Sequence, residues 1–189
     1  MSTEEVDPRF ANYQRDASLA NRLRELDVYE ESTLDGIDHD LDRSDYRVAV
    51  IAGRWHSYVV DALVEGALQA LNDYGVADDQ IDYVQAPGAY EFPLVAQALL
   101  DNDEYNAVIV LGVVIRGETP HFDYVAGECS RCLADLSMSA STPVGFGLLT
   151  VNNVEQALAR SAKGESNKGR EAVLAALEVA DLQEILGDD

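Results

Sequence analysis

The residues best suited to chemistry gather in one short segment, 116–124, which reads RGETPHFDY. In it Gly117 precedes Thr119 and Pro120, residue types typical of the N-cap and the first position of a helix. A glycine turn before a helix N-terminus offers free N–H groups and a positive dipole end, which suits a phosphate group. His121 follows in the first helical turn, where the dipole disfavours its protonated form and favours a general base. A purely structural histidine is the alternative.

A phosphate site also needs a cation. Arg160 ends a later helical segment, and its guanidinium offers two parallel hydrogen bonds to phosphate oxygens. That positive charge would offset the carboxylate of Glu118, which stands beside the glycine turn. A solvated surface charge remains the alternative for a lone arginine.

Two further segments suggest contacts to an organic substrate. Trp55, the only tryptophan, lies in GRWHS after an apolar run, where its ring can stack on a flat heterocycle. Glu91 lies in APGAYEFP, where a carboxylate can bind hydroxyl groups. The structural alternatives are a tryptophan packed on the following helix and an acid that complements a helix dipole.

Other sites are excluded or unsupported by the motifs. The chain has no GxxxxGK[ST] motif and no GxGxxG after its first predicted strand, which excludes a P-loop and a dinucleotide site.

Cys129 and Cys132 have redox-like C-x-x-C spacing, but no second Cys/His pair completes a metal site. Because both lie in a helical pattern, packing is the preferred interpretation and redox chemistry the alternative.

Composition limits the class of partner. The chain has 189 residues, of which 47% are apolar, so we expect one compact domain with its own core. Its 35 acids and 13 bases give a net charge of -22, which argues against nucleic acid and membrane surfaces as partners. The longest apolar run, 107–115, is too short to span a bilayer, and the acidic start is unlike a signal peptide. We therefore expect a cytoplasmic protein, and a salt-rich cytoplasm is one explanation of the acidity.

The first 45 residues differ from the rest. They hold 13 acids and five arginines, and they show no strand pattern. We interpret 1–45 as an acidic extension, with a short helix over 17–26 and an unstructured tether over 35–45. Residues 46–189 then form the catalytic domain.

Within that domain, short apolar runs alternate with helical patterns. The predicted strands are 47–52, 82–85, 107–115 and 144–149. The predicted helices are 58–74, 91–100, 122–139, 153–160 and 168–182, with Asn167 as the N-cap of the last. This alternation predicts a three-layer α/β/α sandwich with a mainly parallel four-stranded sheet, flavodoxin-like in arrangement. Such sheets bind ligands at the carboxyl ends of their strands, where the residues above are found.

Five motifs occur in a fixed order: AGRWHS, APGAYEFP, LGVVIRGETPHFDYV, GFGLLTVNNVEQALAR and SNKGREAV. Together, over residues 46–182, they resemble the lumazine synthase family of riboflavin biosynthesis. The resemblance implies condensation of 5-amino-6-ribitylaminouracil with 3,4-dihydroxy-2-butanone 4-phosphate to 6,7-dimethyl-8-ribityllumazine. It implies these small-molecule substrates, and neither a cofactor nor a metal.

The resemblance also implies roles for individual positions. Trp55 would stack on the pyrimidine, and His121 would transfer protons. The ribityl chain would meet Ala89, Tyr90 and Glu91. The ring would meet the backbone of Val114 and Ile115, with Val113 also in the substrate site. The phosphate would be surrounded by Gly117, Glu118, Thr119 and Arg160. Phe146 and Lys168, with Arg160, would cover the site from the neighbouring subunit.

Assembly and departures from the family pattern complete the expectations. The resemblance implies a homopentamer and leaves a decamer or a 60-mer open.

His56 stands where many members carry Asn, and Glu118 where a small or neutral residue is common, so we expect Glu118 to contribute its backbone N–H. The alternatives to an enzyme are a catalytically retired shell-forming protein and a lumazine- or flavin-binding module.

Overall fold

The computed structural model describes residues 43–102 and 104–187. Four strands form one sheet, β1 (Val48–Gly53), β2 (Ile81–Ala86), β3 (Ala107–Ile115) and β4 (Val144–Val151). Their order is β2-β1-β3-β4, and all three neighbouring pairs are parallel. The predicted parallel four-stranded sheet is confirmed.

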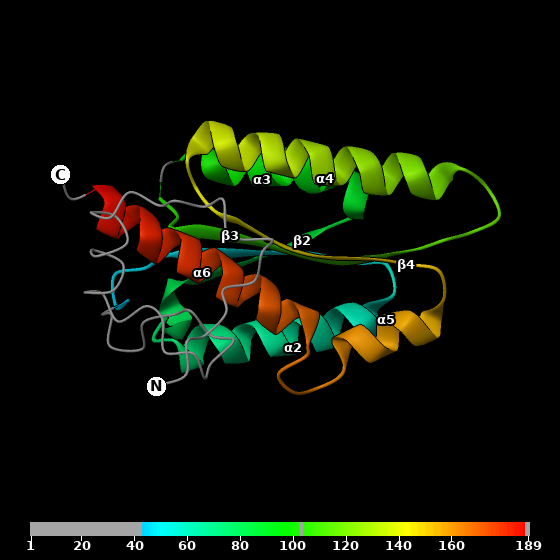
Figure 1. The fold of residues 1–189 in the computed structure, drawn as a ribbon, viewed down its shortest axis with the longest axis horizontal. Coiled ribbons are helices and arrows are strands. Elements are labelled where there is room, and N and C mark those ends of the chain that lie inside the picture. Colours follow the sequence, from blue (N-terminus) through cyan, green and yellow to red (C-terminus); the bar gives the residue numbers. More distant parts are fainter. Residues whose placement is uncertain (1–42, 103, 188–189) are drawn as a thin grey trace, which may run out of the picture. The chain divides into compact units, whose positions relative to one another are not determined.

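Helices cover both faces of this sheet (Figure 1). They are α2 (Ser57–Asp73), α3 (Phe92–Leu100), α4 (His121–Ala140), α5 (Val154–Ser161) and α6 (Lys168–Gly187), with 3₁₀ turns η1 (Asp78–Gln80) and η2 (Ala89–Glu91). α3 and α4 lie on one face, and α2, α5 and α6 lie on the other (Figure 1). Helices on both faces of the sheet confirm the three-layer sandwich.

No helix in the described part of the chain is long and apolar enough to cross a membrane.

The central strands are buried because helices pack on both of their faces. All six residues of β1 are buried, as are the first seven of β3, and these strands are rich in valine and isoleucine. On the α3 and α4 side, Phe92 and Leu133 join the strands in one apolar cluster. On the other side α6 approaches β4 closely, since a Cβ on Gly145 would lie 2.4 Å from the carbonyl oxygen of Ala172.

Helix starts were predicted with mixed success. Asn167 caps α6 as expected, because its Oδ1 accepts hydrogen bonds from the N–H groups of Gly169 and Arg170. The start of α4 was wrong by one residue. Pro120 occupies its N-cap, in place of Thr119, and His121 is the first helical residue.

The folded domain begins before the predicted boundary at residue 46. Arg43 is buried, at 2% exposure, although it lies in the predicted tether. It forms an ion pair of 2.6 Å with Asp181 of α6. The predicted helix over 17–26 and the rest of the tether lie outside the described residues.

Candidate active site

The unequal lengths of β1 and β3 create the floor of a site. The last β1–β3 pair joins Ala52 to Leu111, but β3 continues to Ile115. Beyond that pair β3 is hydrogen-bonded only to β4. The backbone groups of residues 112–115 on the β1 side therefore have no strand partner and are available to a ligand.

A cavity of about 650 Å³ lies over this overhang, and we call it the strand-end cavity. Eight predicted site residues line it: Trp55, Ala89, Tyr90, Glu91, Val113, Val114, Ile115 and His121. These residues lie at or just after the carboxyl ends of β1, β2 and β3, which are far apart in the sequence. The sheet brings them together because the carboxyl ends of parallel strands share one edge.

Gly88 allows the aromatic and acidic parts of this cavity to meet. A Cβ built on Gly88 would lie 3.1 Å from Cδ1 of Trp55 and 3.4 Å from Oε2 of Glu91. Its backbone is extended, so glycine is needed here for close approach and not for an unusual dihedral angle. Trp55 is 71% exposed, so the ring retains a free face for stacking.

Phe92 supports the cavity from below and was missed by the sequence analysis. It is buried, and its ring packs on Gly53 and Gly112, where a Cβ would lie 3.1 Å and 2.8 Å from ring carbons. Two glycines at the same level of neighbouring strands, followed by an aromatic residue near the site, are the signal that could have indicated it.

The first turns of α4 supply one wall. Tyr124 lies one turn after His121, and both line the strand-end cavity. Tyr124 was also missed, although the three-residue spacing from His121 could have suggested it. His56 lines the cavity from the opposite loop and adopts a left-handed backbone conformation, with φ of 56°. Histidine, like asparagine, is enriched in that conformation among residues other than glycine.

An exposed ion pair braces the loop before α4. The Arg116 guanidinium donates two hydrogen bonds to the Asp123 carboxylate, of 2.8 and 3.2 Å, and lies 4.1 Å from the Phe122 ring centroid. These hydrogen bonds lower the pKa of Asp123 from its ordinary value. The ion pair connects Arg116 to Asp123, which lie on either side of His121 in the sequence.

Three predicted phosphate contacts, Gly117, Glu118 and Thr119, lie outside the strand-end cavity. All three are exposed. Among the described residues, their N–H groups donate no backbone hydrogen bond within the loop. They therefore keep donors free for an anion, as the glycine turn suggested.

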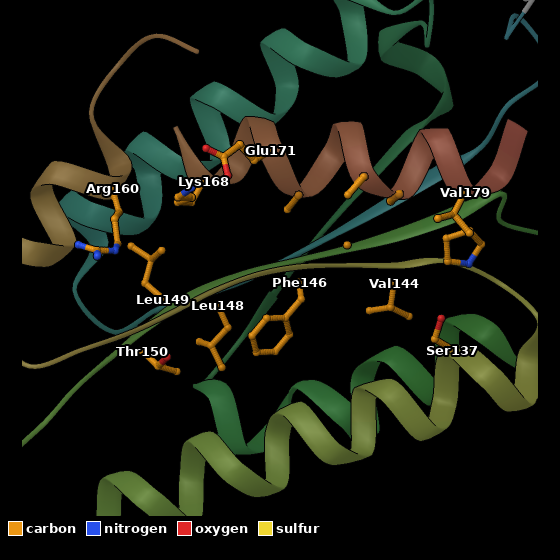
Figure 2. Close-up of a pocket in the computed structure, with 15 residues that line it drawn as sticks. Ser137, Val144, Phe146, Leu148, Leu149, Thr150, Arg160, Lys168, Glu171 and Val179 are labelled. Carbon is orange, nitrogen blue, oxygen red and sulfur yellow. Dashed lines mark hydrogen bonds and ion pairs between the residues drawn. The ribbon is translucent and has the colours of Figure 1, made fainter. Parts of the chain in front are cut away.

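The remaining predicted residues lie in a different place. Phe146, Arg160 and Lys168 line a second cavity of about 600 Å³ along β4, which we call the edge cavity. Arg160 and Lys168 lie toward the same end of it, and Phe146 projects from β4 (Figure 2). No residue lines both cavities. Within one chain, the predicted site residues that line these two cavities therefore lie on two separate surfaces.

The two cations differ in their contacts. Arg160 donates a hydrogen bond to the carbonyl oxygen of Gln156, one turn earlier in α5, at 3.1 Å. Its guanidinium forms no ion pair with a carboxylate among the described residues. Lys168 forms an ion pair with Glu171 on α6. Arg160 is therefore the freer of the two to meet an anion.

Of the two cysteines, Cys129 is a packing residue and Cys132 is half-buried. Cys129 and Cys132 are both free thiols, and Cys129 belongs to the buried cluster beneath α3 and α4. Burial raises the pKa of Cys129 to about 12, so its thiol stays protonated at neutral pH. Within 43–102 and 104–187, no group of three or more His, Cys, Asp or Glu is placed to hold a metal ion.

Comparison with known protein families gives a match. A family model described as 6,7-dimethyl-8-ribityllumazine synthase matches residues 45–184. The matched region contains every strand described above, every helix except the last three residues of α6, both cavities and all the predicted site residues.

Proposed function

The chain belongs to the 6,7-dimethyl-8-ribityllumazine synthase family, and from that premise we propose that it catalyses the lumazine-forming step of riboflavin biosynthesis. The substrates are 5-amino-6-ribitylaminouracil and 3,4-dihydroxy-2-butanone 4-phosphate. The observation that carries the proposal is the strand-end cavity, where Trp55, Glu91 and His121 converge over free strand backbone.

The reaction needs orientation more than a strong catalyst. The 5-amino group attacks the ketone and loses water to form an imine, and phosphate then leaves. Removal of the C3 proton as phosphate departs from C4 gives an enol, which tautomerises to a new carbonyl at C3. The ribitylamino nitrogen closes the ring on that new carbonyl with loss of a second water. Each step moves protons between nitrogen, carbon and oxygen, and no step transfers electrons to an external acceptor. Holding two reactants in one cavity can supply much of the acceleration.

The strand-end cavity suits the pyrimidine. Its ring would stack on Trp55, whose exposed indole lies against Gly88. Its polar edge would exchange hydrogen bonds with the backbone of residues 112–115, which β1 leaves unpaired. The Glu91 carboxylate would accept hydrogen bonds from the ribityl hydroxyl groups, near Ala89 and Tyr90.

His121 and the preceding loop suit the phosphate substrate. The free N–H groups of Gly117, Glu118 and Thr119 would bind the phosphate at the start of α4. His121 lines the cavity at that point and would move protons between the imine and the departing group. The Glu118 carboxylate would repel the phosphate, so a nearby cation is required.

The division into two cavities supports a site shared between subunits. Arg160, Lys168 and Phe146 line the edge cavity of their own chain, apart from Trp55 and His121. We propose a homopentamer in which the edge cavity of one subunit faces the strand-end cavity of the next. Arg160 would then supply the missing cation to its neighbour's phosphate site.

The test follows lumazine fluorescence while the purified protein is mixed with both substrates, against the uncatalysed background. The matched variants are Arg160→Ala and Arg131→Ala; Arg131 lies on α4 and forms exposed ion pairs with Glu128 and Asp135. We expect the wild type to accelerate the reaction. Below saturation with the phosphate substrate, Arg160→Ala should lower that acceleration strongly and Arg131→Ala should leave it unchanged. The same experiment includes quenching of Trp55 fluorescence by the product.

Three outcomes separate the alternatives. Acceleration that depends on Arg160 supports the synthase. Product binding without acceleration favours a lumazine-binding module. Assembly without binding or acceleration favours a retired shell protein. A stable, active monomer would contradict the shared site.

A further inference from the structure

We propose that Asn167 is a positioning residue for phosphate binding, because its side chain fixes the loop that joins Arg160 to Lys168. The two cations line the same cavity and are separated in sequence by the short connection between α5 and α6. This inference rests on the proposed function. It adds a residue that touches no substrate and acts through the two cations.

Asn167 is buried at 1% exposure, and its amide lies within hydrogen-bonding distance of five backbone groups. Nδ2 lies 2.8 Å from the carbonyl oxygen of Ser161 and 3.2 Å from that of Ala162, at the beginning of the connection. Oδ1 accepts from the N–H groups of Gly169 and Arg170, at its end. One side chain therefore joins both ends of the connection.

The same amide also fixes the connection to α2. Nδ2 also lies 3.1 Å from the carbonyl oxygen of Ala62, so three carbonyl oxygens share its two hydrogens. Gly66, one turn later in α2, leaves the space that the amide occupies, since a Cβ there would lie 2.4 Å from Oδ1 of Asn167. On α6, a Cβ on Gly169 would lie 2.1 Å from the carbonyl oxygen of Leu63. These contacts fix both ends of the α5–α6 connection relative to α2.

Only asparagine meets all of these demands at this size. The carbonyl oxygens of three residues need a donor, and two N–H groups need an acceptor, so the residue must offer both. Aspartate has the same shape but would point an acceptor at carbonyl oxygens. Ser161 immediately follows Arg160 and Lys168 immediately follows Asn167, so a shift of either end moves a cation. A misplacement of about 1 Å is enough to cost a large factor in a positioned reaction.

The experiment compares Asn167→Asp and Gly66→Ala, which disturb the amide from its two sides. The matched controls are Asn106→Asp and Gly127→Ala. Asn106 also uses Oδ1 to accept a backbone hydrogen bond, from Arg47, and a Cβ on Gly127 meets nothing within 4 Å. Folding and assembly are checked by circular dichroism and light scattering. Steady-state kinetics then give kcat and the KM of each substrate.

We expect both test variants to raise the KM of the phosphate substrate by about 10-fold or more, with kcat and the KM of the pyrimidine within about twofold. Inhibition by inorganic phosphate should weaken by the same factor. The controls should leave all these values unchanged. A fall in melting temperature with unchanged kinetics, an equal rise in both KM values, or failure of both test variants to fold would overturn the proposal.

Failure of the proposed function is separable from failure of this inference. If the wild-type protein does not accelerate the reaction, calorimetric titration with inorganic phosphate replaces kinetics as the measurement. Phosphate binding by the wild type that both test variants weaken would retain the role of Asn167 without the synthase. Absence of phosphate binding by the wild type would overturn both.

Discussion

The buried ion pair between Arg43 and Asp181 makes a prediction about stability. The Arg43 guanidinium lies 2.6 Å and 3.3 Å from the two Asp181 carboxylate oxygens, and it also donates to the carbonyl oxygen of Tyr74. The Tyr46 hydroxyl lies 2.9 Å from a carboxylate oxygen of Asp181 and 3.0 Å from one of Glu184, so the two carboxylates share its single proton as acceptors. Burial and these two carboxylates raise the pKa of Tyr46, so its hydroxyl keeps its proton.

Arg43→Met is the decisive change. It keeps the apolar length of the side chain and leaves the buried Asp181 without its cation. Loss of one partner from a buried pair costs about 3–5 kcal/mol, because an uncompensated charge remains. Replacement of both partners, by Arg43→Met with Asp181→Leu, removes that charge and should recover most of the loss.

The measurement is urea unfolding followed by circular dichroism, for the wild type, both single variants and the double variant. Protein concentration is held constant, because subunit association contributes to apparent stability. The double-mutant cycle isolates the interaction of the two side chains. Arg131→Met is the exposed control, and it should cost little because solvent screens its ion pairs.

Two results would refute this reasoning. A loss below about 1 kcal/mol for Arg43→Met would mean that Asp181 finds water or another partner when the arginine is absent. A double variant as unstable as the sum of the two singles would mean that the side chains act independently. The first result would also remove Arg43 from the folded domain's stabilising contacts.

Three further predictions concern the site and the cysteines. His121→Ala should lower kcat by at most about 10²–10⁴-fold, the range of general acid–base catalysis, and an unchanged kcat would remove its role. Arg160→Ala should weaken binding of the phosphate substrate by about 1.5–3 kcal/mol, whereas an effect on the pyrimidine alone would contradict the assignment. A thiol reagent at pH 8 should label Cys132 before Cys129, whose pKa is about 12 and whose exposure is 1%; equal labelling rates would contradict this.

Several elements were predictable because local pattern and tertiary environment agree. β3 was predicted with its observed bounds, since a continuous apolar run between helices must be a buried strand. Asn167 was predicted as a helix N-cap from residue type and position, and the hydrogen bonds agree. The start of α4 was displaced by one residue, a difference that is common because the ends of helices have no sharp boundary.

The candidate site was predictable in part for a similar reason. Residues that follow parallel strands meet at one edge, so Trp55, Glu91 and His121 could be placed together from the strand pattern alone. Phe92 was missed because its role depends on glycines in two other strands, Gly53 and Gly112. No local pattern in the sequence contains that contact.

The sequence by itself determined the parallel sheet, the family and the residues available for chemistry, because strand and helix periodicity and ordered motifs are local properties. Tertiary structure decided which of those residues meet. It separated Arg160 from His121 into different cavities, and it joined Arg43 to Asp181 across 138 positions. The physical reason is that burial and shared hydrogen bonds depend on how the layers pack, which spacing along the chain does not encode.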